Sequence, residues 1–209
     1  MTTASAERRT AILRAAARLF EHYGHGKTTI ADVAREAQVG VGTVYLEFPS
    51  KEAIIEELSL STHVGVLDAM RAASKESEDP KARFAAVLMA RTRCFLELRA
   101  RGQHACELVL CKTESVRTAH RRFRDQERAL LASIIDDGQR SGAFAAGAPS
   151  GAAALVQRAF ASLSPPWIFG NDDDAMRATA DLCNLVLEGL STRGAAPRQR
   201  ATTTRRSRR

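Results

Sequence analysis

Apolar residues recur at the spacing of a helix along almost the whole chain, and this pattern limits the folds that the sequence can adopt. Near the N-terminus, Ile12, Ala16, Leu19, Phe20 and Tyr23 would share one face of a helix. No stretch alternates apolar and polar residues as a half-buried strand does. No repeat of about 20–50 residues is found either. The sequence therefore predicts an all-α protein.

Glycine and proline divide this pattern into segments. Gly24 is expected to end the first helix, and Asp79-Pro80, Gly102, Gly142 and Pro149 are expected to interrupt the chain later. A long helix should begin after Ser50 and run as far as Ser74. The later helices are expected at Lys81–Arg101, Gln103–Lys112, Ser115–Arg140, Ser150–Leu163 and Ala175–Leu190.

One short segment, QVGVGTVYLEFPSK at 38–51, allows two interpretations. Its two glycines and β-branched residues suggest a phosphate-binding loop after a strand. A dinucleotide fingerprint, however, needs a third glycine where this chain has Tyr45, and it follows a strand rather than a helix. Pro49 also ends the next segment too early, and no Gly-Lys-Ser/Thr follows. These departures argue against nucleotide binding.

A helix-turn-helix fits the same segment better. Thr29, with Asp32 three residues later, is typical of the start of a helix that ends near Ala37. A short turn with Val39 and Gly40 would follow, and glycine there would supply backbone freedom. A second short helix is expected at about 42–48, held by packing of Val44 and Phe48.

The charge of the chain lies mainly in its C-terminal tail. The net charge is +7, and six arginines between Pro197 and Arg209 account for all but one unit of it. This arm either touches phosphate or is merely solvated. The four cysteines have no framework spacing, and no apolar run approaches the ~20 residues of a membrane span, so we expect a cytoplasmic protein without a membrane segment.

The block TTIADVAREAQVGVGTVYLEFPSK at Thr28–Lys51, with LRAAARLFEHYG before it, resembles the N-terminal domain of the TetR-like transcriptional regulators. The resemblance implies a helix-turn-helix DNA-binding domain at residues 1–51. It also implies a larger helical domain at 52–194 that binds a ligand and forms a homodimer. Residues 195–209 would be a basic, disordered tail. The expected function is repression at a double-stranded DNA operator, relieved by a small-molecule effector.

The resemblance also implies roles for individual residues. Phosphate contacts are expected from Thr29, Thr43, Tyr45 and Lys51, although Tyr45 also fits a core position. Gln38, where the family often has glycine, reads adenine or points to water. Glu47 departs from the family, since a carboxylate there repels phosphate unless it meets a cytosine amino group or a nearby arginine. Base contacts are expected from Ala31, Gly40, Val41, Gly42 and Leu46.

The larger domain offers weaker signals. Helices Ser150–Leu163 and Ala175–Leu190 are the expected dimer interface. The arginines and His120 of the segment Ser115–Arg140 form either a solvated face or, where one points inward, a contact for an acidic ligand. Asp172, Asp173 and Asp174 are expected to favour a helix N-terminus. Candidate effector-pocket residues, which fit a plain core equally well, are Phe84, Leu88, Phe95, Phe123 and Trp167.

Three alternatives to the ligand-released repressor follow from the same residues. A regulator of this fold that activates transcription or needs no ligand is one alternative. Another is a redox or metal sensor built on His104, Cys106 and Cys111, which do not share one helix face. The last is an enzyme, but no Ser/His/Asp or Cys/His grouping stands in a catalytic motif. No cofactor or metal is therefore expected.

Overall fold

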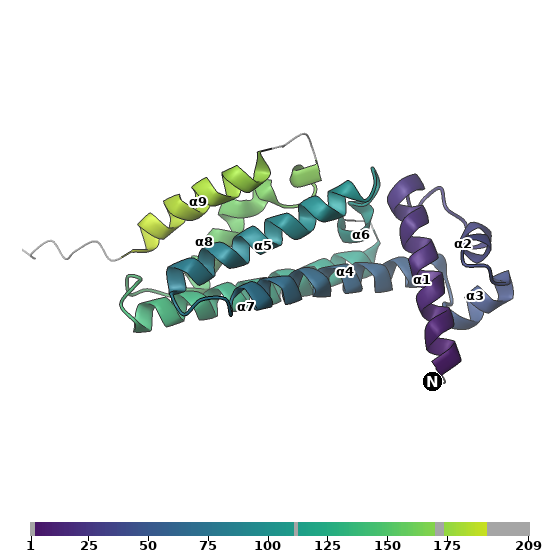
Figure 1. The fold of residues 1–209 in the computed structure, drawn as a ribbon, viewed down its shortest axis with the longest axis horizontal. Helices are drawn as coiled ribbons and strands as arrows, with labels where there is room; N and C mark the ends of the chain where they lie inside the picture. The colour runs from purple at the N-terminus through teal and green to yellow at the C-terminus, as the bar shows by residue number, and fades with distance from the viewer. Residues whose placement is uncertain (1–2, 111–112, 170–173, 192–209) are drawn as a thin grey trace, which may run out of the picture.

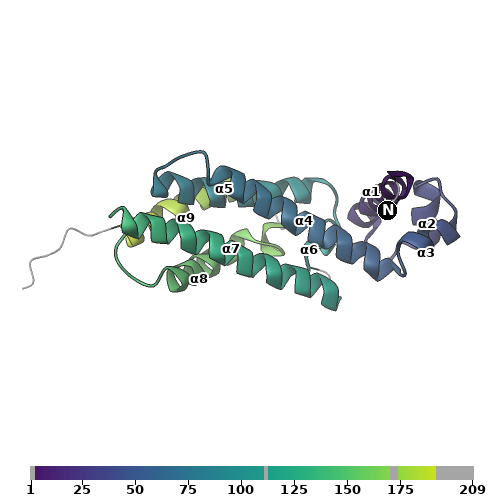
Figure 2. The ribbon, with the colours of Figure 1, turned by 90° about the horizontal axis from the view of Figure 1, so that it is seen from below.

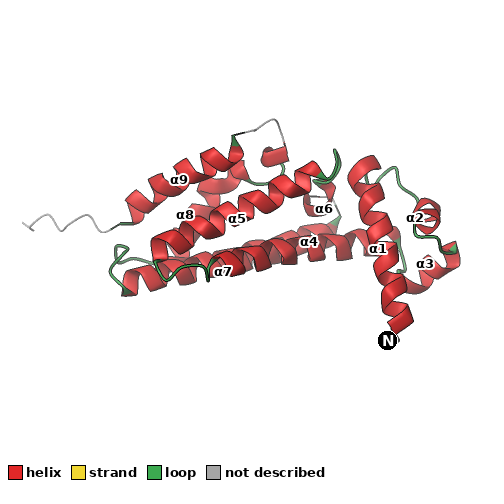
Figure 3. Cartoon of the chain, viewed as in Figure 1, coloured by secondary structure: helices red, strands yellow, loops and turns green. Residues whose placement is uncertain are grey.

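The computed structural model describes residues 3–110, 113–169 and 174–191, and every regular element in these ranges is a helix (Figure 3). The predicted all-α class is confirmed. None of the described helices is long and apolar enough to cross a membrane. The helices form a small unit at one end and a longer bundle that fills the rest of the molecule (Figure 1).

The small unit consists of three helices, α1 (Thr3–Tyr23), α2 (Ile30–Glu36) and α3 (Val41–Glu47). Gly24 ends α1 with φ of +87°, a conformation that glycine adopts without steric cost. Thr29 and Asp32 cap α2 reciprocally, as the sequence predicts: the backbone N–H of Asp32 donates to the Thr29 hydroxyl, and the Asp32 carboxylate accepts from the Thr29 backbone. The core of this unit is formed by Ile12, Phe20, Val33, Val44 and Phe48.

Helix α4 (Lys51–Ala73) connects the small unit to the bundle without a break (Figure 1). The hydroxyl of Ser50 accepts a hydrogen bond from the backbone N–H of Ala53 at 3.1 Å and so caps its first turn. Ile54 and Ile55 are fully buried at its start, whereas Val66 and Met70 are buried in the bundle. One helix therefore belongs to both cores.

The bundle contains α5 (Pro80–Ala100), α7 (Glu114–Arg140), α8 (Pro149–Ala159) and α9 (Ala175–Leu190). Asp79 caps α5 through its carboxylate, and Pro80 occupies the first turn. α4 lies against α5 and α7, while α9 packs on α5 and α8 packs on α7 (Figures 1 and 2). Three of the predicted helices therefore form with small differences at their ends: Lys81–Arg101, Ser115–Arg140 and Ala175–Leu190.

Two helices differ from their predicted lengths. The segment expected to be helical at Gln103–Lys112 contains only the four-residue α6 (Glu107–Leu110), because the backbone N–H of His104 donates to the Glu21 carbonyl oxygen at 2.9 Å instead of continuing a helix. The segment Ser150–Leu163 tightens after Ala159 into a 3-10 turn, η1 (Phe160–Leu163), and a second turn, η2 (Trp167–Phe169), follows. Asp172 and Asp173 lie outside the described residues.

A buried polar network joins three parts of the bundle. Arg91 of α5 is ion-paired to Glu127 of α7, and both side chains are almost fully buried. Arg91 also donates to the carbonyl oxygen of Leu163 at 3.0 Å and to the hydroxyl of Ser164 at 2.6 Å. Gln157 of α8 donates to the second Glu127 oxygen at 2.6 Å. Both buried charges are thus paired with each other and hydrogen-bonded to further groups, as buried ions generally are.

Candidate nucleic-acid interface

The turn before α3 is formed differently from the prediction. Gln38, not a glycine, takes the left-handed conformation, with φ of 57°. Gly40 has an ordinary extended backbone, with φ of −70°, and serves as the N-cap of α3 without a side-chain hydrogen bond. The expectation that glycine supplies the unusual backbone of this turn is therefore wrong. Helix α3 therefore begins without a side-chain cap.

Helix α3 presents one buried face and one exposed face. Val44 and Phe48 are buried against the rest of the small unit. Val41 is 43% exposed, Tyr45 is 53% exposed and Leu46 is 85% exposed. An exposure this high argues against the alternative in which the Tyr45 ring is part of the core. Thr43 is half-buried, and the exposed surface also includes Thr29, Ala31, Gly40 and Gly42.

Glu47, the expected departure from the family, is paired within the chain. Its carboxylate accepts from Nη2 of Arg8 at 2.8 Å, from Nε of Arg8 at 2.9 Å and from the hydroxyl of Ser5 at 3.2 Å. The hydrogen bonds from Arg8 hold the pKa of Glu47 below its usual value. The sequence analysis required either a cytosine amino group or a nearby arginine to offset this carboxylate. The structure contains the arginine.

Lys51 is anchored to the loop between α1 and α2. Its Nζ donates to the carbonyl oxygens of His25 at 2.7 Å and Thr28 at 2.9 Å. These bonds use two of the three N–H groups of the ammonium and leave one for another acceptor. Lys51 therefore fixes the position of the segment that leads into α2, in addition to any contact outside the chain.

The first helix contributes residues that the sequence analysis counted only as charge. Arg9 donates to the carbonyl oxygen of Glu47 at 2.6 Å, forms an ion pair with Glu57 of α4, and lies over the Phe48 ring with its guanidinium carbon 4.0 Å from the ring centroid. Arg8 and Arg9 therefore hold the start of α1 against α3 and α4. Both arginines pair with glutamates that lie about 40 or more positions away, Glu47 and Glu57, so no local sequence pattern indicates these contacts.

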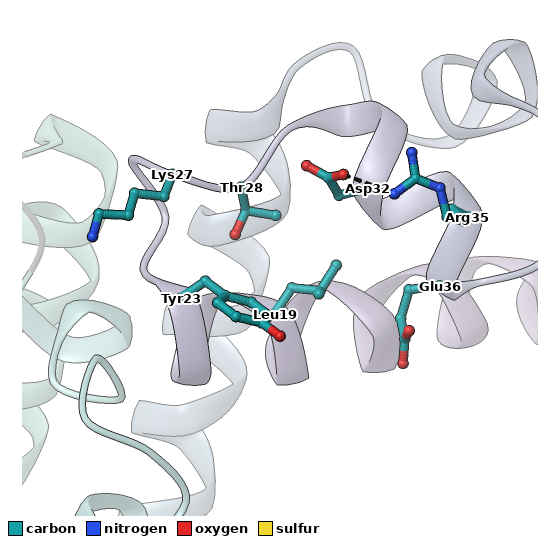
Figure 4. Close-up of a pocket in the computed structure, with 7 residues that line it drawn as sticks. All are labelled: Leu19, Tyr23, Lys27, Thr28, Asp32, Arg35 and Glu36. Carbon is teal, nitrogen blue, oxygen red and sulfur yellow. Dashed lines mark hydrogen bonds and ion pairs between the residues drawn. The ribbon is translucent and has the colours of Figure 1, made fainter.

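Two cations of the small unit are left without a partner in the described chain, Arg14 and Lys27. Lys27 lines an open groove of about 400 Å³ between α1 and α2, together with Leu19, Tyr23, Thr28, Asp32, Arg35 and Glu36 (Figure 4). Its side chain extends away from the paired Asp32 and Arg35 at the other end of the groove (Figure 4). Tyr23 is 54% exposed. The sequence analysis placed Tyr23 only on the apolar face of the first helix and assigned no role to Lys27 or Arg35.

The candidate pocket residues of the larger domain do not form one group. Phe84, Leu88, Phe95 and Phe123 are buried, and the rings of Phe95 and Phe123 pack edge to face with centroids 6.1 Å apart. Trp167 is 69% exposed, so its side chain does not face an interior site in this chain.

The sensor residues are also placed by the structure. Nδ1 of His104 hydrogen-bonds Glu107 at 3.1 Å. Burial raises the pKa of the Cys106 and Cys94 thiols, which disfavours the reactive thiolate. The described residues contain no group of three His, Cys, Asp or Glu side chains placed to hold a metal ion. Cys111 lies outside the described residues.

Arginines of α7 are mostly engaged on the surface. Arg117 and Arg121 both pair with the exposed Glu114, the latter at 2.9 Å, and Arg128 donates to Gln157 at 3.1 Å. His120, in contrast, points inward and lies near His63 of α4. Of the two alternatives for this helix, Arg117 and Arg121 belong to a solvated face, whereas His120 points inward.

The two C-terminal helices expose large apolar side chains. Leu155 of α8 is 69% exposed and Leu185 of α9 is 65% exposed. Ala152 and Ala178, on the same two helices, are small and half-buried. Both leucines are therefore candidates for a surface that another chain covers.

Comparison with known proteins agrees with this architecture. Residues 12–58 match the model for bacterial regulatory proteins of the tetR family, and residues 80–186 match the model for the Tetracyclin repressor-like C-terminal domain. The chain is 28% identical over 192 residues to the uncharacterized HTH-type transcriptional regulator YhgD of Bacillus subtilis (strain 168), covering 90% of this chain and 98% of that protein.

Solved structures show the same fold. A TetR-family regulator from Mesorhizobium loti superposes with a TM-score of 0.74 at 19% identity, over 91% of this chain and 100% of the other. FadR from Bacillus subtilis, solved in complex with stearoyl-CoA, gives a TM-score of 0.70 at 18% identity, over 87% and 98% of the two chains. With both family models matched in chain order, this protein belongs to the TetR family of DNA-binding transcriptional regulators.

Proposed function

We propose that this protein is a cytoplasmic, homodimeric repressor that leaves its operator when a small molecule binds the helical bundle. The observation that carries the proposal is a hydrogen-bonded junction between the two units. Oε2 of Glu107, on α6, accepts from the backbone N–H of His25 at 2.7 Å, just after α1 ends. A change in the bundle that moves α6 would therefore move the DNA-binding unit.

The junction is close-packed as well as hydrogen-bonded. A Cβ atom built on Gly102 would lie 2.2 Å from the carbonyl oxygen of Glu21, so only glycine fits there. Burial raises the pKa of the Glu21 carboxyl, against the opposing effect of the Arg101 guanidinium. Contact between backbones transmits a displacement more directly than contact between long side chains, because it has no rotamers to absorb the movement.

On the DNA, we assign the exposed face of α3 to the major groove. Tyr45, Thr43, Thr29 and Lys51 would contact phosphates, and Val41, Leu46 and their small neighbours Ala31, Gly40 and Gly42 would lie against base edges. Without bidentate side chains on this face, methyl contacts with thymine are the main direct readout available. We add Lys27 as a phosphate contact, since it is exposed and unpaired in the described chain.

Dimerisation would occur through α8 and α9, where Leu155 and Leu185 are exposed. A two-fold dimer places two copies of α3 in successive major grooves when they lie about 34–36 Å apart. An effector that favours another separation lowers the affinity for the operator. FadR, a relative in fold, was solved with stearoyl-CoA, which supports a small-molecule effector for the present bundle as well.

The test is a footprint on the DNA upstream of the gene that encodes this protein. A protected palindrome is expected, and small-molecule fractions of the host cell should release it. Absence of any sequence-specific protection would refute DNA regulation at this site. Protection that no fraction relieves would indicate a ligand-independent regulator, and a rise of transcription with the protein bound would indicate an activator.

A matched pair of variants tests the junction itself. Glu107→Gln removes the charge of the acceptor at His25 but keeps its shape, and Glu97→Gln makes the same change at an exposed position of α5. We expect Glu107→Gln to change the effector concentration that releases DNA, while Glu97→Gln leaves it unchanged. Equal behaviour of both variants would contradict a role of the junction in coupling.

A further inference from the structure

Helix α3 exposes large side chains although it has only seven residues. Val41 and Tyr45 are exposed, and Leu46 is 85% exposed. Val44, in contrast, is fully buried and holds the helix on the small unit. The exposed side chains of α3 are therefore a candidate contact surface.

Few polar groups of α3 are free to read base edges. Its sequence, VGTVYLE, contains no arginine, lysine, asparagine or glutamine, the residues that form the common hydrogen bonds with guanine and adenine. Glu47 could accept from a cytosine amino group, but its side chain is only 7% exposed and already accepts from Arg8 at 2.8 Å. We assign the hydroxyl groups of Thr43 and Tyr45 to phosphates. Apolar contact is therefore the main means by which this helix can distinguish bases.

Gly42 leaves open space on the exposed side of α3. A Cβ atom built on Gly42 would meet no atom of the described chain within 4 Å, apart from its neighbours in sequence and the backbone of its own helix. The backbone of Gly42 is an ordinary right-handed helix, so alanine would be allowed there and would favour the helix. Packing within the described chain thus gives no reason for glycine. Because residues four apart share a helix face, the open space lies on the side of Leu46.

This space is suited to the C5-methyl group of a pyrimidine. A Cβ atom is itself the size of a methyl group, so the clearance around it shows that no side chain of the described residues blocks the approach of a methyl group to Gly42. Thymine is the one unmodified base of DNA that carries a methyl group, and it presents that group in the major groove. 5-Methylcytosine carries the same group on the same ring carbon. Contact with Leu46 would remove apolar surface of both partners from water and so favour binding.

We infer that α3 reads the C5-methyl group of a pyrimidine rather than the full edge of a base, and that it therefore accepts 5-methylcytosine where it accepts thymine. Leu46 would contact the methyl group, and Gly42 would let it approach the helix. This inference rests on the proposed function, in which α3 lies in the major groove of the operator. Its consequence is that methylation of a cytosine at the contacted position strengthens binding of the regulator.

Two modified bases separate the methyl group from the rest of the base edge. Uracil keeps the O4 acceptor of thymine and its pairing with adenine, but it lacks the methyl group. 5-Methylcytosine keeps the methyl group, but it presents an amino donor in place of O4 and pairs with guanine. A helix that reads the full edge of thymine therefore prefers uracil to 5-methylcytosine, whereas a helix that reads the methyl group has the opposite preference.

The experiment uses the full-length protein and an operator found by footprinting or by selection from random DNA. Each thymine is replaced by uracil at the same position of both half-sites, and the affinity is measured by fluorescence anisotropy. We expect at least one position at which the affinity falls about fourfold for each lost methyl group, which corresponds to ~0.8 kcal/mol. At that position, DNA with 5-methylcytosine should bind more tightly than DNA with uracil, and about fourfold per half-site more tightly than DNA with unmodified cytosine.

A pair of leucine variants tests the contact with the methyl group. Leu46→Ala removes the side chain that would contact the methyl group, so it should bind the thymine and uracil operators with equal affinity. Leu60→Ala makes the same change at an exposed leucine of α4 and should keep the preference for thymine. A full thymine preference in Leu46→Ala would overturn the inference.

Gly42→Ala tests the open space. The added Cβ atom occupies the approach to the helix, so this variant should bind the thymine operator more weakly than the native chain. Alanine also favours the helix, so urea unfolding should show a variant at least as stable as the native chain. Unchanged binding by Gly42→Ala would contradict the approach of a methyl group at this position.

The comparison of operators with the native protein needs no variant. Equal affinity for thymine and uracil at every position would overturn the inference, and so would tighter binding of uracil than of 5-methylcytosine where thymine is preferred. In both cases a specific operator exists, so the regulatory function stands and methyl reading fails. If no specific operator is found, the proposed function fails, and the inference that rests on it fails as well.

Discussion

At the scale of single residues, His63 is buried and has a lowered pKa, and the sequence reveals neither property. Its place on α4 is visible as part of a helical pattern, but its neighbours come from two other helices. Burial beside His120 lowers its pKa, and the carbonyl of Ser59 opposes that effect. A buried neutral histidine makes the stability of the fold depend on pH.

The pH dependence has a defined sign. The pKa of His63 is lowered from 6.5 to about 4 in the folded protein, so the unfolded chain binds a proton first as the pH falls. The contribution of neutral His63 to the free energy of unfolding is fully present above pH 6.5. It falls by about 3 kcal/mol as the pH drops from 6.5 to about 4. Urea unfolding of the native chain and of His63→Phe between these values measures it. If the free energy of unfolding changes with pH in the same way in both proteins, His63 is not the source of the pH dependence.

A second residue-scale prediction concerns Glu47 and Arg8. Arg8→Ala leaves the Glu47 carboxylate unpaired on the surface assigned to DNA, where it repels phosphate. We expect operator affinity to fall about tenfold. Adding Glu47→Gln to Arg8→Ala removes the repulsive charge and should restore most of the affinity. If the double variant binds as weakly as Arg8→Ala, Arg8 contacts DNA itself rather than neutralising Glu47.

Much of the residue-level site could be predicted from the sequence where it depends on neighbours in the chain. The reciprocal cap of Thr29 and Asp32 is local, and the structure contains it. The pairing of Glu47 with Arg8 joins residues 39 positions apart, and the anchoring of Lys51 at the His25 carbonyl spans 26 positions. Separations of this size along the chain leave no pattern in a single sequence. The pairing of Glu47 with an arginine was therefore only one of two alternatives, and the anchoring of Lys51 was missed.

At the scale of helices, local signals set the ends of most elements. Ser50 and Asp79 cap α4 and α5 as their chemistry requires. The exceptions have tertiary causes. α6 is short because the chain after Gly102 bonds to the end of α1, and no local signal in Gln103–Lys112 indicates that contact. The glycines of the turn before α3 suggested the wrong residue for its left-handed position, since Gln38 occupies it.

Gln38 gives a prediction at this scale. A residue with a Cβ pays about 1 kcal/mol in the left-handed conformation, whereas glycine does not. Gln38→Gly should therefore raise the free energy of unfolding by about 0.5–1 kcal/mol, because the side chain of Gln38 is exposed and no contact is lost. Chemical denaturation measures the change, and Gln38→Ala is the control that removes the side chain but keeps the Cβ. A stabilisation by alanine equal to that by glycine would show that backbone strain is not the cause.

At the scale of the whole molecule, α8 and α9 offer the surface that we assign to a second chain. Leu185 is exposed in the single chain, so Leu185→Arg should leave the fold intact. In a dimer the same arginine would be buried without a partner, and we expect monomers in sedimentation experiments. Leu60→Arg, at another exposed leucine on α4, is the matched control and should stay dimeric. A dimer that survives Leu185→Arg would place the interface elsewhere.

The arginine-rich tail belongs to the same scale. The end of α9 lies at the opposite end of the molecule from α2 and α3 (Figure 1). We propose that the arginines of the tail nevertheless contact DNA phosphates, and a fully extended chain of this length would span about 60 Å. Each phosphate that it engages steepens the slope of log K against log salt by about 0.9. A chain that ends at Ala196 should show a shallower slope on operator and random DNA alike, and equal slopes would mean that the arm makes no contact.

The unbroken course of α4 has a mechanical consequence. A helix of 23 residues is about 34 Å long and stiff along its axis. A tilt of about 5° at its far end, which a few altered side-chain contacts in the bundle can produce, swings its near end by about 3 Å. A hydrogen bond between protein and DNA is lost when the distance between donor and acceptor increases by about 0.5 Å. α4 thus converts a small tilt within the bundle into a larger displacement of the small unit, which is the motion that the proposed release from DNA requires.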